Sequence, residues 1–283
     1  IYGARVECLA PLASGQLAVG GTFLSAGGRA ASDVALWDGS GWSGLGAARG
    51  PDGIVLTQAA TSNGDVFAGG YFETVDGRIA NGIARWDGEA WSPVGNYING
   101  RGWVTGIASG QNGGVIAAAY FYDLVHPAFA KVARWNGAGW SELGGGAGFD
   151  DSVYAVATLL NGDVVAGGRF RAVDGTAAGG IARWDGTAWR LMGSGVPNLG
   201  IIYSLLVLPD GNLVAGGSFA SIGSIAANGV GLWDGSAWHS VGTGFTGVVR
   251  SLAGIPSGGF VAAGYGLLGG GSFAAEWDGQ AWS

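Results

Sequence analysis

Short apolar segments, each closed by a turn that contains glycine, recur along the whole chain. The fourth occurrence shows the pattern most fully. Its residues 153–159 and 164–166 are apolar runs separated by an Asn-Gly-Asp turn, which is typical of a β-hairpin. After a loop, residues 181–184 form a third run, and the turn at Asp185-Gly186 leads to a fourth segment. Short strands and regular turns without a long helical pattern predict radially repeated four-stranded sheets.

Paired tryptophans mark each repeat. The motif Trp-Asp/Asn-Gly-x-x-Trp recurs at intervals of 49 residues four times and then 44, and it begins at Trp37, Trp86, Trp135, Trp184, Trp233 and Trp277. Its second tryptophans are Trp42, Trp91, Trp140, Trp189, Trp238 and Trp282. Such regular spacing indicates packing between sheets rather than an array of sugar-binding rings. Trp103 is the one tryptophan of the 13 that does not repeat.

Further positions keep the same period. A pair of small residues, usually Gly-Gly, precedes a phenylalanine by one residue in most units, as at Phe23, Phe72, Phe121, Phe170 and Phe219. We therefore predict an all-β fold, a six-bladed β-propeller with four antiparallel strands per blade. One domain is expected over residues 1–283, with blades over residues 1–46, 47–95, 96–144, 145–193, 194–242 and 243–283.

The repeat resembles the kelch-like family of bacterial β-propellers. The resemblance rests on Ala-Gly-Gly-x-Phe followed by Ile-Ala-Arg-Trp-Asp-Gly-x-Ala-Trp, although kelch repeats carry tyrosine where Trp37 and its equivalents stand. It implies an extracellular or cell-surface location. The family includes the propeller of galactose oxidase, but no matching set of tyrosine, histidine and cysteine copper ligands is found, so no cofactor is expected.

Composition narrows the classes of partner. Hydrophobic residues make up 48% of the 283, only 12% are charged, and the net charge is −7. The core is ample, and nucleic acid is a poor partner because phosphate binding needs a concentrated basic patch. No apolar run approaches the roughly 18 residues of a membrane helix, so no membrane insertion is expected. One cysteine, Cys8, allows neither an internal disulfide nor a cysteine-based zinc site.

Residues that keep the repeat are expected to be structural. Cys8 stands where other units carry small residues and is expected to be packed, and His239 is expected to be solvated. The aspartates of Trp-Asp-Gly are expected to accept hydrogen bonds from backbone N–H groups of their own turns. Glu7 and Arg250 share one position of the first strand and are expected to pair with each other where the first and last blades meet.

Residues that break the repeat are the candidates for binding. Blade three departs most from the pattern, and aromatic rings beside charged groups there suit a glycan or a peptide. The candidate ligand-binding residues are Tyr97, Arg101, Trp103, Tyr122, Asp123 and His126. The alternative is a loop that has drifted and buries its own aromatic side chains. Asp150 and Asp151 are weak candidates for a cation site with oxygen ligands, and no metal is otherwise expected.

Three functions stay open. The first is a non-catalytic binding or scaffolding propeller of a secreted or cell-surface protein, with its ligand near blade three. The second is a glycan-active enzyme using Asp123, Asp150 or Asp151, none of which forms an evident acid/base pair. The third is a structural subunit of an extracellular assembly that uses exposed edge strands. A propeller fold is compatible with all three.

Overall fold

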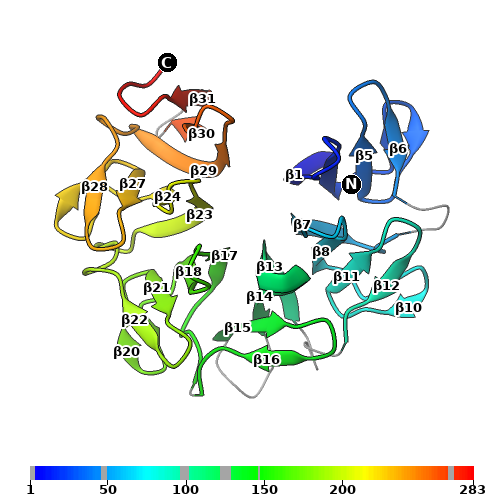
Figure 1. The fold of residues 1–283 in the computed structure, drawn as a ribbon, viewed down its shortest axis with the longest axis horizontal. Helices are drawn as coiled ribbons and strands as arrows, with labels where there is room; N and C mark the ends of the chain where they lie inside the picture. The colour runs from blue at the N-terminus through cyan, green and yellow to red at the C-terminus, as the bar shows by residue number, and fades with distance from the viewer. Residues whose placement is uncertain (1–3, 46–49, 96–101, 122–128, 146, 267–270) are drawn as a thin grey trace. The chain divides into compact units, whose positions relative to one another are not determined.

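The chain divides into two compact units, and each contains three large sheets and two small hairpins. The computed structural model describes residues 4–45, 50–95, 102–121, 129–145, 147–266 and 271–283. Unit 1 spans Ile1–Glu142 and unit 2 spans Leu143–Ser283 (Figure 1). The expectation of one domain over residues 1–283 stays a prediction.

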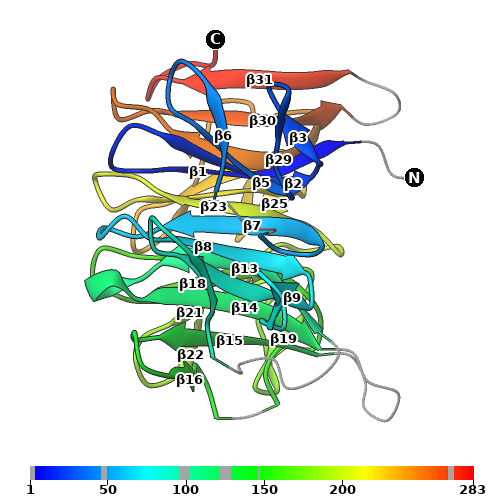
Figure 2. The same cartoon turned by 90° about the vertical axis from the view of Figure 1, so that its right-hand side faces the viewer.

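Unit 1 has three four-stranded antiparallel sheets, which we call blades one to three. Their strands are β1 (Arg5–Pro11), β2 (Leu17–Thr22), β5 (Val34–Trp37) and β6 (Trp42–Gly44); β7 (Ile54–Ala60), β8 (Val66–Tyr71), β11 (Ile83–Trp86) and β12 (Trp91–Pro93); and β13 (Gly102–Ser109), β14 (Val115–Phe121), β15 (Phe129–Trp135) and β16 (Trp140–Glu142). Two small hairpins follow the second strands of blades one and two: β3 (Ser25–Ala26) with β4 (Arg29–Ala30), and β9 (Thr74–Val75) with β10 (Arg78–Ile79). A 3₁₀ turn, η1 (Gln111–Gly113), joins β13 to β14. Neighbouring strands of blades two and three, such as β7, β8 and β13, lie side by side (Figure 2).

Unit 2 repeats this architecture in blades four to six. Its sheet strands are β17 (Val153–Thr158), β18 (Val164–Gly168), β21 (Ile181–Trp184) and β22 (Trp189–Leu191); β23 (Ile201–Val207), β24 (Leu213–Ser218), β27 (Val230–Trp233) and β28 (Trp238–Ser240); and β29 (Gly247–Gly254), β30 (Phe260–Gly266) and β31 (Ser272–Trp277). The small hairpins are β19 (Ala172–Val173) with β20 (Thr176–Ala177), and β25 (Ser221–Ile222) with β26 (Ile225–Ala226). An antiparallel bridge between Trp277 and Trp282 takes the place of the fourth strand in blade six. The predicted six-bladed β-propeller with four antiparallel strands per blade is confirmed.

The repeated aromatic residues hold neighbouring blades together. Phe72 and Phe170 are buried, and Trp91 is 1% exposed. The indole Nε1 of Trp91 donates to the carbonyl of Leu45 at the end of the preceding blade, at 2.9 Å. Equivalent bonds come from Trp140, Trp189, Trp238 and Trp282, at 2.7–3.0 Å. A buried indole needs such an acceptor, so the repeated tryptophans have a structural role.

The six turns between the last two strands of each blade share one cap. In five of them the aspartate of Trp-Asp-Gly accepts two backbone N–H groups of its own turn, at 2.7–3.0 Å. Asn136 does the same in blade three, at 2.9 Å for both bonds. The predicted turn-forming role of these residues is confirmed.

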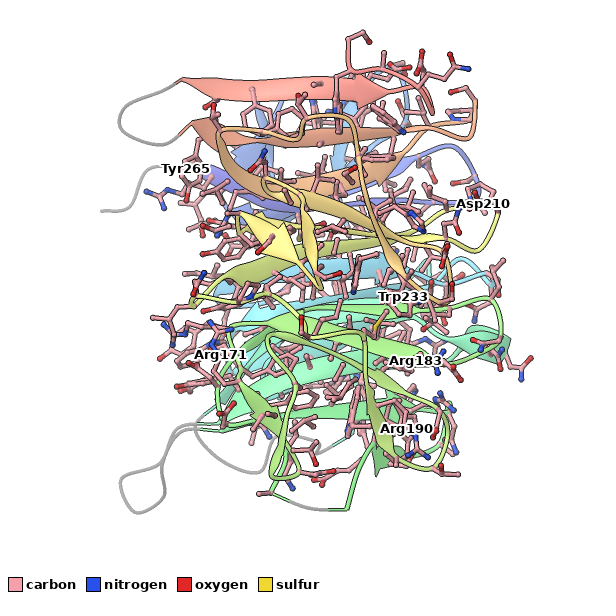
Figure 3. The ribbon with its side chains drawn as sticks, turned by 90° about the vertical axis from the view of Figure 1, so that its left-hand side faces the viewer. Arg171, Arg183, Arg190, Asp210, Trp233 and Tyr265 are labelled. Atoms are coloured by element: carbon pink, nitrogen blue, oxygen red, sulfur yellow. The ribbon has the colours of Figure 1, made fainter. Side chains whose placement is uncertain are left out.

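Two ends of each blade can now be distinguished. The turn end carries the turns between first and second and between third and fourth strands. The loop end carries the segments between second and third strands and those that lead from one blade to the next. In unit 2, Arg171 and Tyr265 lie at the loop end, and Asp210 lies at the turn end (Figure 3).

Candidate functional site

Three aromatic side chains meet at the loop end of blades two and three. Tyr71 ends β8, and Tyr120 holds the same position of the repeat in β14. Trp103 in β13 is paired directly with Tyr120 across the sheet. The ring centroid of Trp103 lies 5.8 Å from that of Tyr71 and 5.3 Å from that of Tyr120. The three rings, which we call the aromatic cluster, therefore form a continuous series over two neighbouring blades.

The repeat explains why these rings share one end of the sheet. Tyr71 and Tyr120 each follow a small pair, and after Tyr71 the next residue, Phe72, enters the core. Trp103 lies at the same strand end because it is paired with Tyr120. Blades one, four and five carry different chemistry at the same point, namely Thr22, Arg169 and Ser218, and blade six again has a tyrosine, Tyr265. This position thus varies in chemistry while its backbone setting repeats.

The aromatic cluster is accessible and carries no described ion pair. Tyr71 is 62% exposed, and Trp103 and Tyr120 are half-buried. None of the salt bridges found among the described residues involves these three side chains. Two phenol hydroxyls and an indole N–H supply hydrogen-bonding groups beside apolar ring surface. Such a surface suits a ligand that has both an apolar face and hydroxyl groups.

Trp103 is the one predicted ligand-binding residue that the structure describes. It lies in the aromatic cluster, whereas the other five lie outside the described residues: Tyr97, Arg101, Tyr122, Asp123 and His126. Tyr71 and Tyr120 were not among the predicted site residues. Their shared repeat position, next to the strand that carries Trp103, is a signal already present in the sequence.

Asp150 and Asp151 hold the loop that precedes blade four. Asp150 Oδ1 accepts the backbone N–H groups of Arg171 and Ala172, at 2.8 and 2.9 Å. Asp151 forms an ion pair with Arg169, whose Nε lies 2.8 Å from Oδ2, and accepts the N–H of Ser152. Partial burial raises the pKa of Asp151, but hydrogen bonds from Arg169 and Ser152 outweigh this effect and lower it overall. Both carboxylates thus already have structural partners.

A second aromatic series lies on the first strands of unit 2. Every first strand has a β-bulge within its first four residues. Tyr154, Tyr203 and Arg250 occupy the bulge in β17, β23 and β29. The rings of Tyr154 and Tyr203 lie 5.6 Å apart, and the Arg250 guanidinium lies 4.0 Å above the ring of Tyr203. This cation–π contact gives Arg250 a partner within unit 2. Its expected pairing with Glu7 stays a prediction.

The remaining candidates lie apart from the aromatic cluster. Burial raises the pKa of the Cys8 thiol to about 12, and Sγ contacts the Val55 carbonyl, so the thiol is packed, as predicted. His239 is exposed, as predicted, with Nε2 2.7 Å from Asp234 Oδ2. Within the described ranges, no group of three or more His, Cys, Asp and Glu side chains is placed to hold a metal ion. The described part also contains no helix long and apolar enough to span a bilayer.

Comparison with known proteins shows the fold and no family. No protein-family model and no curated protein matches the chain. The kelch-like assignment therefore stays a prediction. Similarity to solved structures shows the fold, and the three structures described next are 10–11% identical to this chain.

Three solved structures illustrate the similarity. The extracellular domain of a hybrid two-component system from B. thetaiotaomicron is 11% identical, with a TM-score of 0.63 over 99% of this chain and 33% of that one. The β-propeller domain of the Trilobed protease from Pyrococcus furiosus, described as having an open velcro topology, is 10% identical, with a TM-score of 0.61 over 100% and 84%. Virginiamycin B lyase from Staphylococcus aureus, in an inactive form with quinupristin, is 10% identical, with a TM-score of 0.60 over 99% and 83%. This chain thus spans about a third of the first structure and most of the other two.

Proposed function

We propose that the protein is a non-catalytic, extracellular carbohydrate-binding propeller whose ligand stacks on the aromatic cluster of Tyr71, Trp103 and Tyr120. The observation that carries the proposal is the contact series of these rings at 5.3–5.8 Å, with the one unrepeated tryptophan at its centre. Aromatic side chains of this kind dominate binding energies because they offer large, rigid contact areas.

Carbohydrate is favoured over peptide by the chemistry of the described cluster. A sugar ring presents an apolar face of C–H groups for stacking and hydroxyl groups for the phenols and the indole N–H. Peptide recognition commonly adds a charged anchor or a sheet edge that pairs with the peptide backbone. The described cluster contains no charged side chain that could serve as such an anchor, and Trp103 is already paired with Tyr120 across β13 and β14.

The environment of the described carboxylates supports the non-catalytic part of the proposal. Hydrolysis of a glycosidic bond uses two carboxyl groups at a defined separation across the sugar. Asp150 and Asp151, two of the three predicted candidates, belong to unit 2 and are held by loop hydrogen bonds and an ion pair. The extracellular location is supported by the extracellular domain among the propellers of similar fold.

A glycan array followed by titration calorimetry tests the proposal. We expect Trp103→Ala to lower the affinity for the sugar by at least about 30-fold, which corresponds to a loss of about 2 kcal/mol in binding free energy. Tyr71→Ala should lower the affinity for the sugar less, because Tyr71 lies at one end of the series of rings. Tyr265→Ala is the matched control, since Tyr265 holds the same repeat position in blade six and is 45% exposed. It should bind as the parent protein does.

Two results would count against the proposal. One is the absence of any retained sugar together with binding to a peptide array, which would make the ligand a peptide. The other is that Trp103→Ala binds the sugar with the same affinity as the parent protein, when circular dichroism shows that both proteins are folded.

A further inference from the structure

Blades two and four share a contact that fastens the small hairpin at the loop end. Asp52 Oδ1 accepts the backbone N–H groups of Glu73 and Thr74, both at 2.9 Å, and Oδ2 accepts the Thr74 hydroxyl at 2.8 Å. Asp150 stands 98 residues later, two repeats along the chain, and accepts the two equivalent N–H groups of blade four. The fold itself thus shows a carboxylate seated on two adjacent backbone donors.

Blade five has the same donors and no aspartate. Leu199 stands at the position of Asp52 and Asp150, and the equivalent N–H groups belong to Ala220 and Ser221. No described side chain accepts a hydrogen bond from either of these N–H groups. Ser221 also places a hydroxyl where blade two has that of Thr74. Blade five therefore keeps the donors of a carboxylate seat and lacks the carboxylate.

The loop before blade five follows a different course for a local reason. In blades two and four, Gly50 and Gly148 donate their N–H to Asp76 and Asp174, at 2.9 and 3.0 Å. Proline, which has no N–H, replaces this glycine at position 197, and Gly223 replaces the aspartate. Both side-chain contacts between the loop and the hairpin are therefore lost together.

The altered loop turns Leu199 outward. Asn198 and Leu199 have φ angles of 53° and 60°, a left-handed conformation that is uncommon for leucine. Leu199 is 78% exposed. Backbone strain of this kind clusters at binding sites.

A pocket of about 450 Å³ occupies this place. Asn198, Leu199, Ala220, Ser221, Phe245 and Thr246 are among the lining residues. Every lining residue is neutral, so no carboxylate within the pocket repels an anion. Arg171 lies against the same loop and donates from Nη2 to the Gly200 carbonyl at 2.9 Å, whereas its Nη1 has no hydrogen-bond partner among the residues that the structure describes. Its guanidinium forms no salt bridge among the described residues and lies at the loop end of unit 2 (Figure 3).

We propose that this pocket binds a carboxylate of a ligand, seated on the N–H groups of Ala220 and Ser221 and on the Ser221 hydroxyl. The ligand takes the place that Asp52 and Asp150 fill within their own blades. Two N–H donors on one carboxylate oxygen are a common way to bind an anion through the backbone. A uronic acid and an acidic amino-acid side chain both present this group beside a body that can contact the Phe245 ring.

The site is independent of the proposed sugar site. It belongs to unit 2, whereas the aromatic cluster belongs to unit 1. Failure of one assignment therefore leaves the other unaffected.

Amide NMR titration of the whole chain tests the carboxylate seat directly. Sodium acetate, galacturonate and N-acetylglutamate are the probes, and sodium chloride at equal ionic strength and galactose are the controls. We expect the amide protons of Ala220 and Ser221 to move downfield and to saturate with the carboxylates alone. Tighter binding of galacturonate than of N-acetylglutamate would identify a sugar acid as the ligand class, and the reverse order an acidic peptide.

Restoring the repeat in blade five provides the decisive variant. Pro197→Gly combined with Leu199→Asp should supply the missing carboxylate from within the chain. It should lower the affinity for the carboxylate probes at least tenfold. Leu160→Asp is the matched control, because Leu160 is 68% exposed in a turn at the other end of blade four. It adds the same charge and should leave the probes bound.

A second variant, which removes the cap from blade four, keeps the proposal testable if the double mutant does not fold. Asp150→Ala should expose the equivalent donors, so that acetate shifts the amides of Arg171 and Ala172, which it should not do in the parent protein. The proposal is overturned if the Ala220 and Ser221 amides respond to chloride as they do to carboxylates, or show no saturable response.

Discussion

The two ends of the blades differ in how strictly they repeat. At the turn end, all six blades place an aspartate or asparagine on the same pair of backbone donors, with Asn136 as the single change of residue. At the loop end, one repeat position carries threonine, tyrosine, arginine or serine, and the hairpin cap is present at Asp52 and Asp150 but absent at Leu199. The turn end stabilises the fold, and the loop end is where chemistry varies on a constant backbone.

The largest expected difference is in the unfolding free energy lost when a repeated tryptophan, Trp91, or the unrepeated Trp103 is replaced by alanine. Trp91→Ala removes a side chain that is 1% exposed and bonded to the Leu45 carbonyl, so it should lower the free energy of unfolding by about 3–5 kcal/mol. Trp103→Ala should cost less than about 2 kcal/mol, because its ring lies half-buried at the strand end. Urea unfolding of both variants measures the difference. An equal or larger loss for Trp103→Ala would break the distinction between packing and binding residues.

A smaller effect is expected where the hairpin cap is compared between blades. Asp150→Ala leaves two backbone N–H groups without their acceptor and should cost about 1–2 kcal/mol of unfolding free energy. Leu199→Ala, at the same repeat position in blade five, should change it by less than about 0.5 kcal/mol. Thermal or urea unfolding of the pair checks this. Similar losses at both positions would mean that Leu199 also stabilises its loop.

The smallest effect concerns pH and the turn end. Hydrogen bonds from the N–H groups of Ala90 and Glu89 lower the pKa of Asp87 below its usual value. Its contribution to stability is therefore complete above about pH 4, the pKa range of an unfolded aspartate, and is lost as pH falls through the lower folded pKa.

Asparagine at this turn position should remove that pH dependence. Asp87→Asn should lower the urea midpoint slightly at pH 7 and leave it unchanged at about pH 2 relative to the parent protein. The reverse change in blade three, Asn136→Asp, should raise the midpoint at pH 7 and lose this gain in acid. A constant difference at both pH values would show that the charge of the turn aspartate is irrelevant.

Much of the fold was predictable because each repeat of about 49 residues carries its own local signals. The paired tryptophans, turn glycines and small pairs recur at one spacing, and they locate all four strands of a blade without long-range information. The β-bulge in every first strand was not predictable, because a bulge depends on the register between two strands rather than on composition.

The candidate site was predictable only in part. Trp103 stood out as the tryptophan without a repeat, but Tyr71 lies 32 residues earlier in another blade, and only the packing of β13 beside β8 brings the two rings together. The role of Asp150 in capping the hairpin was not predictable, since the N–H groups that it accepts lie 21 and 22 residues away. The sequence alone did not mark Leu199 as a candidate, because it is notable only where Asp52 and Asp150 are known to cap the equivalent hairpins of blades two and four.

Hydrogen exchange followed by mass spectrometry, with the sugar selected by the glycan array, tests the central claim most directly. We expect the bound sugar to slow amide exchange at the loop end, in peptides that contain Tyr71, Trp103 and Tyr120, and to leave the Trp-Asp-Gly turns unchanged. Protection confined to those turns, or no protection near the three aromatic residues, would contradict the assignment of binding to the part of each blade that departs from the repeat.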